Sequence, residues 1–182
     1  MRIVAGKFKG RIINTPNGKN TRPTLDKVRE ALFSIIQFNV ENCVFLDLFS
    51  GSGAIGIEAI SRGASKVIFN DYDNRAISII KDNISLLEID SNLYKIFNGD
   101  YKKTLQFLKE EKITFDIIYL DPPYKNKINE EIIEFLLNNK MLNDFAIIII
   151  ESDSTYTINN TFGLITKEYK YGLAKLTTMK KI

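Results

Sequence analysis

Asp121, Pro122, Pro123 and Tyr124 form the most specific chemical motif in the sequence, directly after the apolar run 117–120. The motif predicts methyl transfer to an amino group on a nucleobase, a poor nucleophile because its lone pair is delocalised into the ring. The Asp121 carboxylate and the Pro122 carbonyl could accept its two hydrogens and stabilise the positive charge that develops on nitrogen. The prolines would stiffen the corner, and the Tyr124 ring could stack on an extruded base. Asp-Pro-Pro also occurs as a plain turn, so this interpretation depends on its position after a strand.

A glycine-rich segment, residues 47–53, follows another apolar run and leads into a predicted helix. Gly51, Gly53 and Gly56 match the pattern G-x-G-x-x-G, which alone also fits a dinucleotide site. Asp47 argues against a pyrophosphate, because a helix start that binds phosphate offers amides without a nearby carboxylate. The sulfonium and ammonium groups of S-adenosylmethionine are cations and suit this carboxylate. The glycines would let the backbone approach such a cofactor closely.

Two further acids follow the next predicted strands. Asp71, about 20 residues after Gly51, could accept hydrogen bonds from both ribose hydroxyls, and Asp100 could accept one from the adenine amino group. With Asp47, they would lie at the carboxyl ends of neighbouring parallel strands, where such sheets bind ligands. Taken singly, Asp47 and Asp71 could instead be helix caps or loop acids. The predicted cofactor contacts are Asp47, Ser50, Gly51, Gly53, Asp71 and Asp100, and the predicted catalytic residues are Asp121, Pro122 and Tyr124.

Predicted strands and helices alternate through the middle of the sequence. Apolar runs predict strands at 44–48, 66–70, 93–97, 115–120 and 145–150, and helical periodicity predicts helices at 54–62, 74–87, 101–109 and 129–138. Continuous apolar strands are typical of a parallel sheet with helices on both faces. Strands predicted at 164–171 and 173–179 are separated only by Gly172, which favours an antiparallel hairpin at the sheet edge. By fold analogy we expect an α/β protein, a Rossmann-like class I methyltransferase with a seven-stranded, mostly parallel sheet flanked by helices.

Positive charge is concentrated near both ends of the sequence. Residues 1–30 contain eight Lys and Arg against two acids, and residues 166–182 contain five Lys against one acid, so the part between them is acidic. A polyanion docking at one place would explain this distribution, although an ordinary solvated surface would as well. The two halves of residues 2–13 predict an N-terminal β-hairpin extension, with Gly6 and Gly10 at turn positions. The predicted RNA contacts are Lys7, Lys9, Arg11 and Arg22.

The composition limits the available chemistry. With 182 residues, 45% of them hydrophobic, we expect one domain, with a basic N-terminal hairpin and loop at 1–23 and a catalytic core at 24–182. The absence of His and the single Cys43 exclude Ser-His-Asp and Cys-His mechanisms and an intrachain disulfide, and they argue strongly against a zinc site. The sequence has no apolar run long enough for a membrane span and no secretory signal. We therefore expect a cytoplasmic protein without a metal or an obligate protein partner.

The motifs together make the sequence similar to a known family. They lie at 2–6, 9–11, 21–30, 45–53, 56–59, 61–64 and 121–124. Over nearly its whole length the chain resembles the bacterial methyltransferases that modify guanine N2 in 16S ribosomal RNA. The resemblance implies that the hairpin and the region of Arg22 help to hold RNA, and that the substrate is an assembling or assembled small ribosomal subunit. Asp71 stands where related enzymes often have Glu.

Three other functions remain open from the residues alone. An adenine-N6 DNA methyltransferase would use the same tetrapeptide, although such enzymes usually need extra residues to read bases in a groove. A non-catalytic RNA-binding assembly factor could keep the fold of a cofactor site. A nicotinamide-dependent oxidoreductase would satisfy the glycine pattern.

Overall fold

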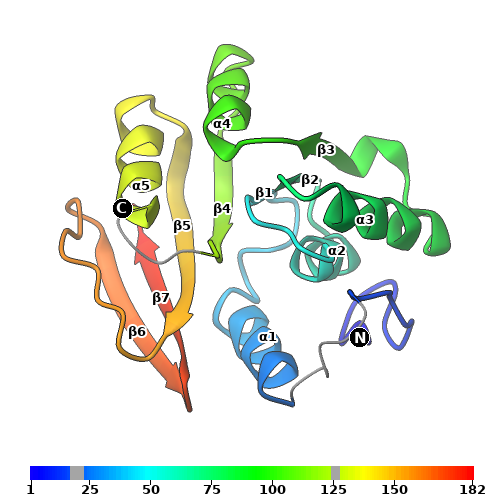
Figure 1. Ribbon diagram of the computed structural model, residues 1–182. Helices are drawn as coiled ribbons and strands as arrows, with labels where there is room; N and C mark the ends of the chain where they lie inside the picture. Colours follow the sequence, from blue (N-terminus) through cyan, green and yellow to red (C-terminus); the bar gives the residue numbers. More distant parts are fainter. Residues whose placement is uncertain (17–22, 124–127) are drawn as a thin grey trace.

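A seven-stranded sheet with helices on both faces forms the body of the molecule (Figure 1). The computed structural model describes residues 1–16, 23–123 and 128–182. The strands in chain order are β1 (Val44–Asp47), β2 (Lys66–Asp71), β3 (Tyr94–Asn98), β4 (Phe115–Leu120), β5 (Leu142–Asp153), β6 (Ile165–Tyr171) and β7 (Ala174–Lys180). In space their order is β3-β2-β1-β4-β5-β7-β6.

The strand directions confirm the predicted sheet. Strands β1 to β5 pair in parallel, whereas β7 pairs antiparallel with both β5 and β6. The chain runs outward from β1 through β2 to β3 and then returns to the other side of β1 with β4. This reversal creates a switch point between β1 and β4, and ligands bind at the carboxyl ends of the strands beside such a point. Asp47 and Asp121 come at the ends of these two strands.

The helices bury two apolar cores, one on each face of the sheet. They are α1 (Pro23–Ile35), α2 (Ala54–Ser61), α3 (Asn74–Leu86), α4 (Tyr101–Glu110) and α5 (Ile128–Asn138), with a short 3-10 turn at Ser91–Leu93. The first three helices contribute to one core, and α4 and α5 to the other. Phe45 and Ile117 lie in the first core, and their neighbours Leu46 and Ile118 lie in the second. Because both of their faces are buried, the central strands contain apolar runs such as 44–46, 117–120 and 147–150. None of the described helices is long and apolar enough to cross a membrane.

Strand β5 is longer than the apolar run 145–150 that predicts it, because it has partners on both sides. The strand comprises Leu142–Asp153. Its recorded pairing with β4 ends where Ile150 lies opposite Leu120, and from Glu151 onward it pairs only with β7. The polar end of β5 therefore extends past β4 at the carboxyl edge of the sheet.

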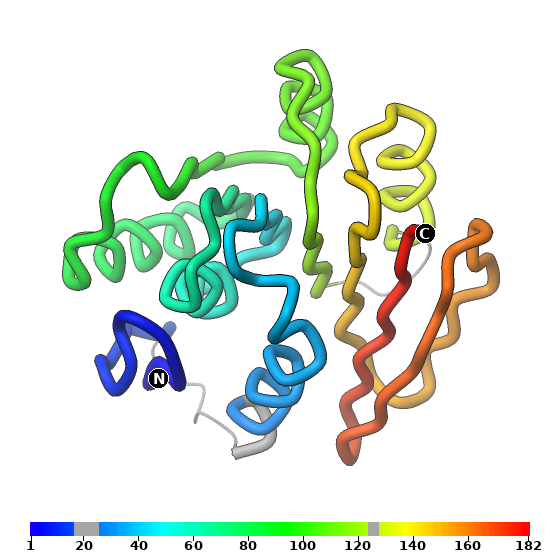
Figure 2. Tube along the Cα trace, turned by 180° about the vertical axis from the view of Figure 1, so that it is seen from behind, coloured from blue at the N-terminus to red at the C-terminus, as the bar shows by residue number. Residues whose placement is uncertain are grey.

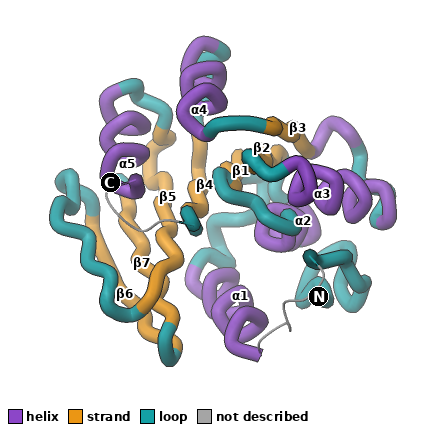
Figure 3. The backbone as a smooth tube through the Cα atoms, in the orientation of Figure 1, coloured by secondary structure: helices purple, strands orange, loops and turns teal. Residues whose placement is uncertain are grey.

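The N-terminal segment, residues 1–14, forms an antiparallel contact rather than the two regular strands of the predicted hairpin (Figure 3). Arg2 and Ile12 form a single bridge, and the Ile3 amide donates to the Arg11 carbonyl at 2.9 Å. The ladder does not continue because the next two amides donate to a side chain on α2 instead. Viewed from behind, the segment lies beside α2 and α3, far from the C-terminal hairpin (Figure 2).

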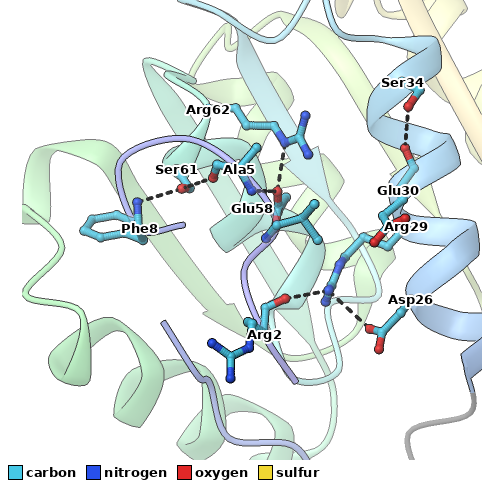
Figure 4. A network of polar contacts seen from close by, with 11 residues as sticks. Arg2, Ala5, Phe8, Asp26, Arg29, Glu30, Ser34, Glu58, Ser61 and Arg62 are labelled. Carbon is cyan, nitrogen blue, oxygen red and sulfur yellow. Dashed lines mark hydrogen bonds and ion pairs between the residues drawn. The ribbon is translucent and has the colours of Figure 1, made fainter. Parts of the chain in front are cut away.

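Glu58 on α2 is the side chain that receives these amides. Its buried carboxylate accepts the Val4 amide at 2.9 Å and the Ala5 amide at 3.0 Å (Figure 4). Arg62 donates to the same carboxylate at 2.8 Å, and its guanidinium carbon lies 4.6 Å from the ring centre of Phe33 on α1. A charge can be buried at tolerable cost when it is both paired and hydrogen-bonded in this way. Glu58 thus links the N-terminal segment to α2.

Gly6 and Ser61 bring the backbone of the N-terminal segment into direct contact with α2. The Ser61 hydroxyl donates to the Ala5 carbonyl at 2.5 Å and accepts the Phe8 amide at 2.9 Å (Figure 4). Gly6 has a φ of 80°, and a Cβ built on it would lie 1.7 Å from the Ser61 carbonyl oxygen. Both the backbone conformation and the close approach therefore require glycine.

Asn83 on α3 joins the end of the N-terminal segment to the loop after β1. Its buried side chain accepts the Asn14 amide at 2.7 Å and donates to the Asn14 carbonyl at 3.0 Å. The same side-chain nitrogen donates to the Ser52 carbonyl at 3.1 Å. One amide group therefore fixes two loops that are distant in the sequence.

Candidate active site

The loop between β1 and α2 has the turns that its glycines predict. Gly51 and Gly53 have φ of 53° and 75°, in the left-handed region. A Cβ on Gly51 would meet none of the described atoms within 4 Å, so this side of the loop is open. Gly56 serves packing, because a Cβ there would lie 2.2 Å from Cε1 of Phe69 on β2. The first two glycines shape the loop, and the third allows α2 to lie close to the sheet.

Asp47, at the end of β1, is buried beneath this loop and is 1% exposed. Its Oδ2 accepts the Gly56 amide at 3.1 Å, whereas Oδ1 has no hydrogen-bond partner among the residues that the structure describes. Burial raises the pKa of this carboxyl to about 7, and the charges of Asp71 and Asp121 contribute to the increase. A buried oxygen without a donor is unfavourable. A cation with hydrogens to donate would satisfy it.

Ser50 and Asn70 hold the loop in shape. The Ser50 hydroxyl donates to the Asp47 carbonyl at 2.7 Å and accepts the Asn70 amide at 3.1 Å. The buried Asn70 side chain donates to the Leu48 carbonyl at 3.1 Å and accepts the Thr104 hydroxyl at 2.6 Å. The sequence predicts Ser50 as a cofactor contact, but its hydroxyl hydrogen is used within the loop. In this structure Ser50 positions the loop, and Asn70 is a positioning residue that the sequence pattern did not reveal.

Asp71, the last residue of β2, connects that strand to the glycine loop. Its Oδ2 accepts the Gly51 amide at 2.8 Å, and its Oδ1 accepts the Asp73 amide at 2.9 Å. Each carboxylate oxygen can accept more than one hydrogen bond. The partly exposed Asp71 can therefore hold the loop and still accept the ribose hydroxyls of the predicted cofactor.

Asp100 lines a cavity of about 200 Å³ at the carboxyl edge of the sheet. The residue also caps α4, because its Oδ1 accepts the Lys102 amide at 2.8 Å. The cavity is formed by residues that follow β1, β2, β3 and β4, namely Phe49, Asn70, Tyr72, Gly99, Asp100, Tyr101, Pro123 and Ile128. It therefore brings one predicted cofactor acid together with the predicted catalytic motif. Its aromatic lining suits a planar ring.

Asp121 follows β4 directly and is exposed, whereas Pro122 is buried. Asp47 is paired with Tyr119, two residues before Asp121, and after burial the negative charge of Asp121 is one of the causes that raise the pKa of Asp47 and Tyr119. The structure therefore brings the first part of the predicted catalytic motif to the predicted cofactor acid. Tyr124 lies outside the described residues, and its predicted stacking role stays a prediction.

Tyr119 and Glu151 form a polar pair beside Asp121 that was not predicted. The Tyr119 hydroxyl donates to Glu151 Oε2. Burial raises the pKa of Tyr119 well above its usual value, and the charges of Glu151, Asp121 and Asp47 raise it further. The phenol thus stays protonated and remains a donor. One sequence signal could have pointed to Glu151, because it is the first polar residue after an apolar run, as Asp47 and Asp121 are.

Four carboxylates lie at or within two residues of the carboxyl ends of the consecutive strands β2, β1, β4 and β5. We call this set, which consists of Asp71, Asp47, Asp121 and Glu151, the strand-end site. Within the described ranges, no three side chains are placed to hold a metal ion. The concentration of negative charge instead suits an organic cation. Asp47, Asp71 and Asp100 are the residues that could hold a cationic cofactor. The nearby Asp121 carboxylate could accept a hydrogen from an amine.

The predicted RNA contacts Lys7, Lys9 and Arg11 are exposed on the N-terminal segment, although its backbone is held against α2 and α3. Arg11 donates to the Leu86 carbonyl at the end of α3, at 2.9 Å. The structure thus groups three of the four predicted cations on one fixed segment. The fourth, Arg22, lies outside the described residues.

The sequence matches a known protein family over almost its whole length. Residues 1–180 match the family described as "Conserved hypothetical protein 95". Ribosomal RNA small subunit methyltransferase D of Buchnera aphidicola subsp. Baizongia pistaciae is 37% identical, over 100% of this chain and 88% of that protein. This chain belongs to that family. The resemblance that the sequence motifs indicate is therefore confirmed.

Solved structures confirm the predicted fold class. The structure of yhhF from Escherichia coli has a TM-score of 0.83 at 28% identity and covers 100% of this chain and 97% of that one. SMU.776, solved in complex with SAH, has a TM-score of 0.66 over 85% of this chain and 48% of that one. At 19% identity, the likeness to SMU.776 shows the fold alone. The fold is the Rossmann-like methyltransferase fold.

Proposed function

We propose that this protein transfers a methyl group from S-adenosylmethionine to the exocyclic N2 amine of a guanine in 16S ribosomal RNA. The main observation behind this proposal is that Asp47 ends β1 and Asp121 follows β4, the two adjacent parallel strands at the switch point of the sheet. The hydrogen-bond acceptor for the amine, Asp121, therefore lies beside Asp47, the acid that suits the cationic cofactor. Membership in the family of Ribosomal RNA small subunit methyltransferase D supports RNA as the class of substrate.

S-adenosylmethionine fits the residues around the glycine loop. The unpaired oxygen of Asp47 suits an ammonium, and the open side of Gly51 leaves the backbone accessible to a ligand. Asp71 can accept ribose hydroxyls, and the cavity lined by Phe49 and Asp100 suits the adenine ring. When bound, the cofactor supplies an electrophilic methyl group on a positively charged sulfur. The fold relative SMU.776 was solved with SAH, the demethylated form of this cofactor.

Asp121 and Pro122 act on the amine. The Asp121 carboxylate and the Pro122 carbonyl accept its two hydrogens, which makes the nitrogen lone pair available for attack. Methylation would leave the nitrogen positively charged, and the adjacent Asp121 carboxylate would stabilise that charge. Asp121 then takes one hydrogen as a proton, and a neutral methylated amine remains. A stacked base on Tyr124 would complete the arrangement.

The N-terminal segment supplies the contacts to the RNA backbone. Lys7, Lys9 and Arg11 lie exposed on a segment whose backbone is already fixed. Little backbone conformational entropy is therefore lost when a polyanion docks. Arg22 adds to this set as a prediction from the sequence. The substrate is the small ribosomal subunit, assembling or assembled.

The test is methylation of undermethylated small subunits with labelled S-adenosylmethionine, followed by mapping of the modified base. Label is expected on N2 of a guanine. Asp121→Asn should lower turnover by about a hundredfold while cofactor affinity changes by less than about threefold, because the carboxylate acts on the amine. The matched control is Asp144→Asn, an acid at the start of β5 with an 83% exposed side chain, which should retain full activity.

Each rival function predicts a different result in the same assays. Label in adenine of duplex DNA would favour a DNA methyltransferase. RNA binding without cofactor binding in calorimetry would favour an assembly factor. Protection against thermal unfolding by NAD and not by S-adenosylmethionine would favour an oxidoreductase.

A further inference from the structure

Glu151 lies on the strand next to the amine acceptor Asp121, directly after the last residue of β5 that pairs with β4. In the register of β4 and β5, Tyr119 lies opposite Ile149 and Leu120 lies opposite Ile150. The next residues along the two strands are Asp121 and Glu151. Because paired strands are about 4.8 Å apart, the backbones that carry these two carboxylates are close neighbours.

The side chain of Glu151 is directed to the same face of the sheet as the cofactor acid. Side chains along a strand alternate between its faces. Ile149, two residues before Glu151, lies in the core that also contains Tyr119 and Phe45, two residues before Asp47. Glu151, Tyr119 and Asp47 therefore share one face, on the side of α1, α2 and α3.

A buried phenol holds the Glu151 carboxylate in place. Tyr119 is 4% exposed and donates its hydroxyl to Glu151 Oε2, whereas Glu151 itself is partly exposed. The two oxygens of a carboxylate offer about four lone pairs, so Glu151 can accept several donors at once. A donor fixed from the buried side makes Glu151 a pre-positioned acceptor at the rim of the strand-end site.

We propose that Glu151 accepts the N1 hydrogen of the target guanine and thereby selects guanine as the substrate base. This inference rests on the proposed function. On the base edge of guanine, the amine that Asp121 holds is adjacent to N1, which carries a hydrogen. In adenine the ring nitrogen beside the amine is a bare acceptor. A carboxylate facing that position binds guanine and repels adenine, since two acceptors would oppose each other.

The experiment compares small-subunit RNA that carries guanine at the mapped position with RNA that carries 2-aminopurine there. Both bases have the reacting amine, but N1 of 2-aminopurine has no hydrogen. The wild-type protein should prefer guanine by about a hundredfold or more in kcat/KM. Glu151→Gln should reduce that preference at least about tenfold, because the amide can donate to a bare N1. Asp144→Asn is the matched control and should keep the wild-type ratio.

A purely structural role for Glu151 predicts a different outcome. In that case Glu151→Gln would lower kcat/KM for both bases equally and leave their ratio unchanged, and this result would overturn the proposal. Equal use of both bases by the wild-type protein would overturn it as well. If Glu151→Gln does not fold, Tyr119→Phe tests the same point. It removes only the hydroxyl that holds Glu151, and it should reduce the preference by about threefold or more; an unchanged ratio overturns the proposal. Absence of guanine methylation by the wild-type protein would instead overturn the proposed function.

Discussion

The N-terminal segment and the strand-end site each depend on a carboxylate that is 1% exposed, but the two carboxylates have different surroundings. Glu58 accepts two amides of the segment and pairs with Arg62. Asp47 accepts one amide, and its other oxygen has no partner in the part of the chain that the structure describes. Burial by itself therefore does not distinguish a structural acid from a binding acid. The two kinds of acid are distinguished by the hydrogen-bond donors that the chain provides for each carboxylate oxygen.

The same contrast decides which charge each region presents. The Glu58 charge is compensated within the protein, and the N-terminal segment leaves Lys7 and Lys9 exposed, as the proposed docking of a polyanion requires. Burial and the neighbouring charges of the strand-end site raise the pKa of Asp47 and Tyr119, which suits the cationic ligand that we propose for this site. In the proposed function, the N-terminal segment binds an anion through exposed cations, and the strand-end site binds a cation through its carboxylates.

Replacement of Glu58 should have the largest effect. Glu58→Gln keeps the shape of the side chain but leaves the Arg62 guanidinium without its charge partner, so it should lower the free energy of unfolding by about 3 kcal/mol. Chemical denaturation measures this change. The control is Glu134→Gln at an exposed position on α5, which should change stability by less than about 0.5 kcal/mol. A similarly small loss at Glu58 would contradict its role in holding the segment.

Asp47 should give a pH dependence of intermediate size. Because its pKa is raised to about 7 in the folded protein, that state retains a proton which the unfolded chain releases near pH 4. The ligand-free protein should therefore lose stability as the pH rises between these values. A bound cation favours the charged form, so affinity for S-adenosylmethionine should rise about tenfold from pH 6 to pH 8.

Asp47→Asn removes the titrating group, so both pH dependences should become flat. Thermal unfolding measures the first, and calorimetry at several pH values measures the second. Asp144→Asn should retain both pH dependences. Parallel curves for the wild-type and Asp47→Asn proteins would mean that another group is responsible.

The smallest expected effect concerns the cations of the N-terminal segment. Lys9→Ala should weaken RNA binding a few-fold and reduce the slope of log affinity against log salt by about 0.7 to 0.9. Binding titrations at several salt concentrations measure the slope. Lys109→Ala, an exposed lysine in the last turn of α4, is the control and should leave the slope unchanged. If both variants give the same slope as the wild-type protein, Lys9 is not part of the RNA interface.

The sequence predicts strands best where their burial is uniform. Strand β4 matches the predicted range 115–120 because parallel neighbours flank it on both sides and both of its faces are buried. The extension of β5 to Asp153 could not be predicted, because it depends on pairing with residues of β7 about 20 positions later. The N-terminal hairpin is predicted from its two halves with Gly6 and Gly10 at turn positions, but two of its amides bond to Glu58, which lies far along the chain.

In the candidate site, too, some residues could be predicted from the strands, whereas others depend on partners that are distant in the sequence. Asp47, Asp71 and Asp121 follow predicted strands, so their position at one edge could be predicted from strand order alone. The positioning role of Ser50 depends on the Asn70 amide, and the place of Glu151 depends on Tyr119, a residue on another strand. Local pattern contains no information on such pairings.

Strand β7 occupies the place between β5 and β6, although it follows both of them in the sequence. A nascent chain that has been synthesised only as far as β6 therefore carries a β5 edge without its final neighbour, including the isoleucines at 147–150. Unpaired apolar edges template association between molecules. Translation through residues 174–180 is thus the step that closes this edge, and slow elongation before it prolongs exposure to aggregation.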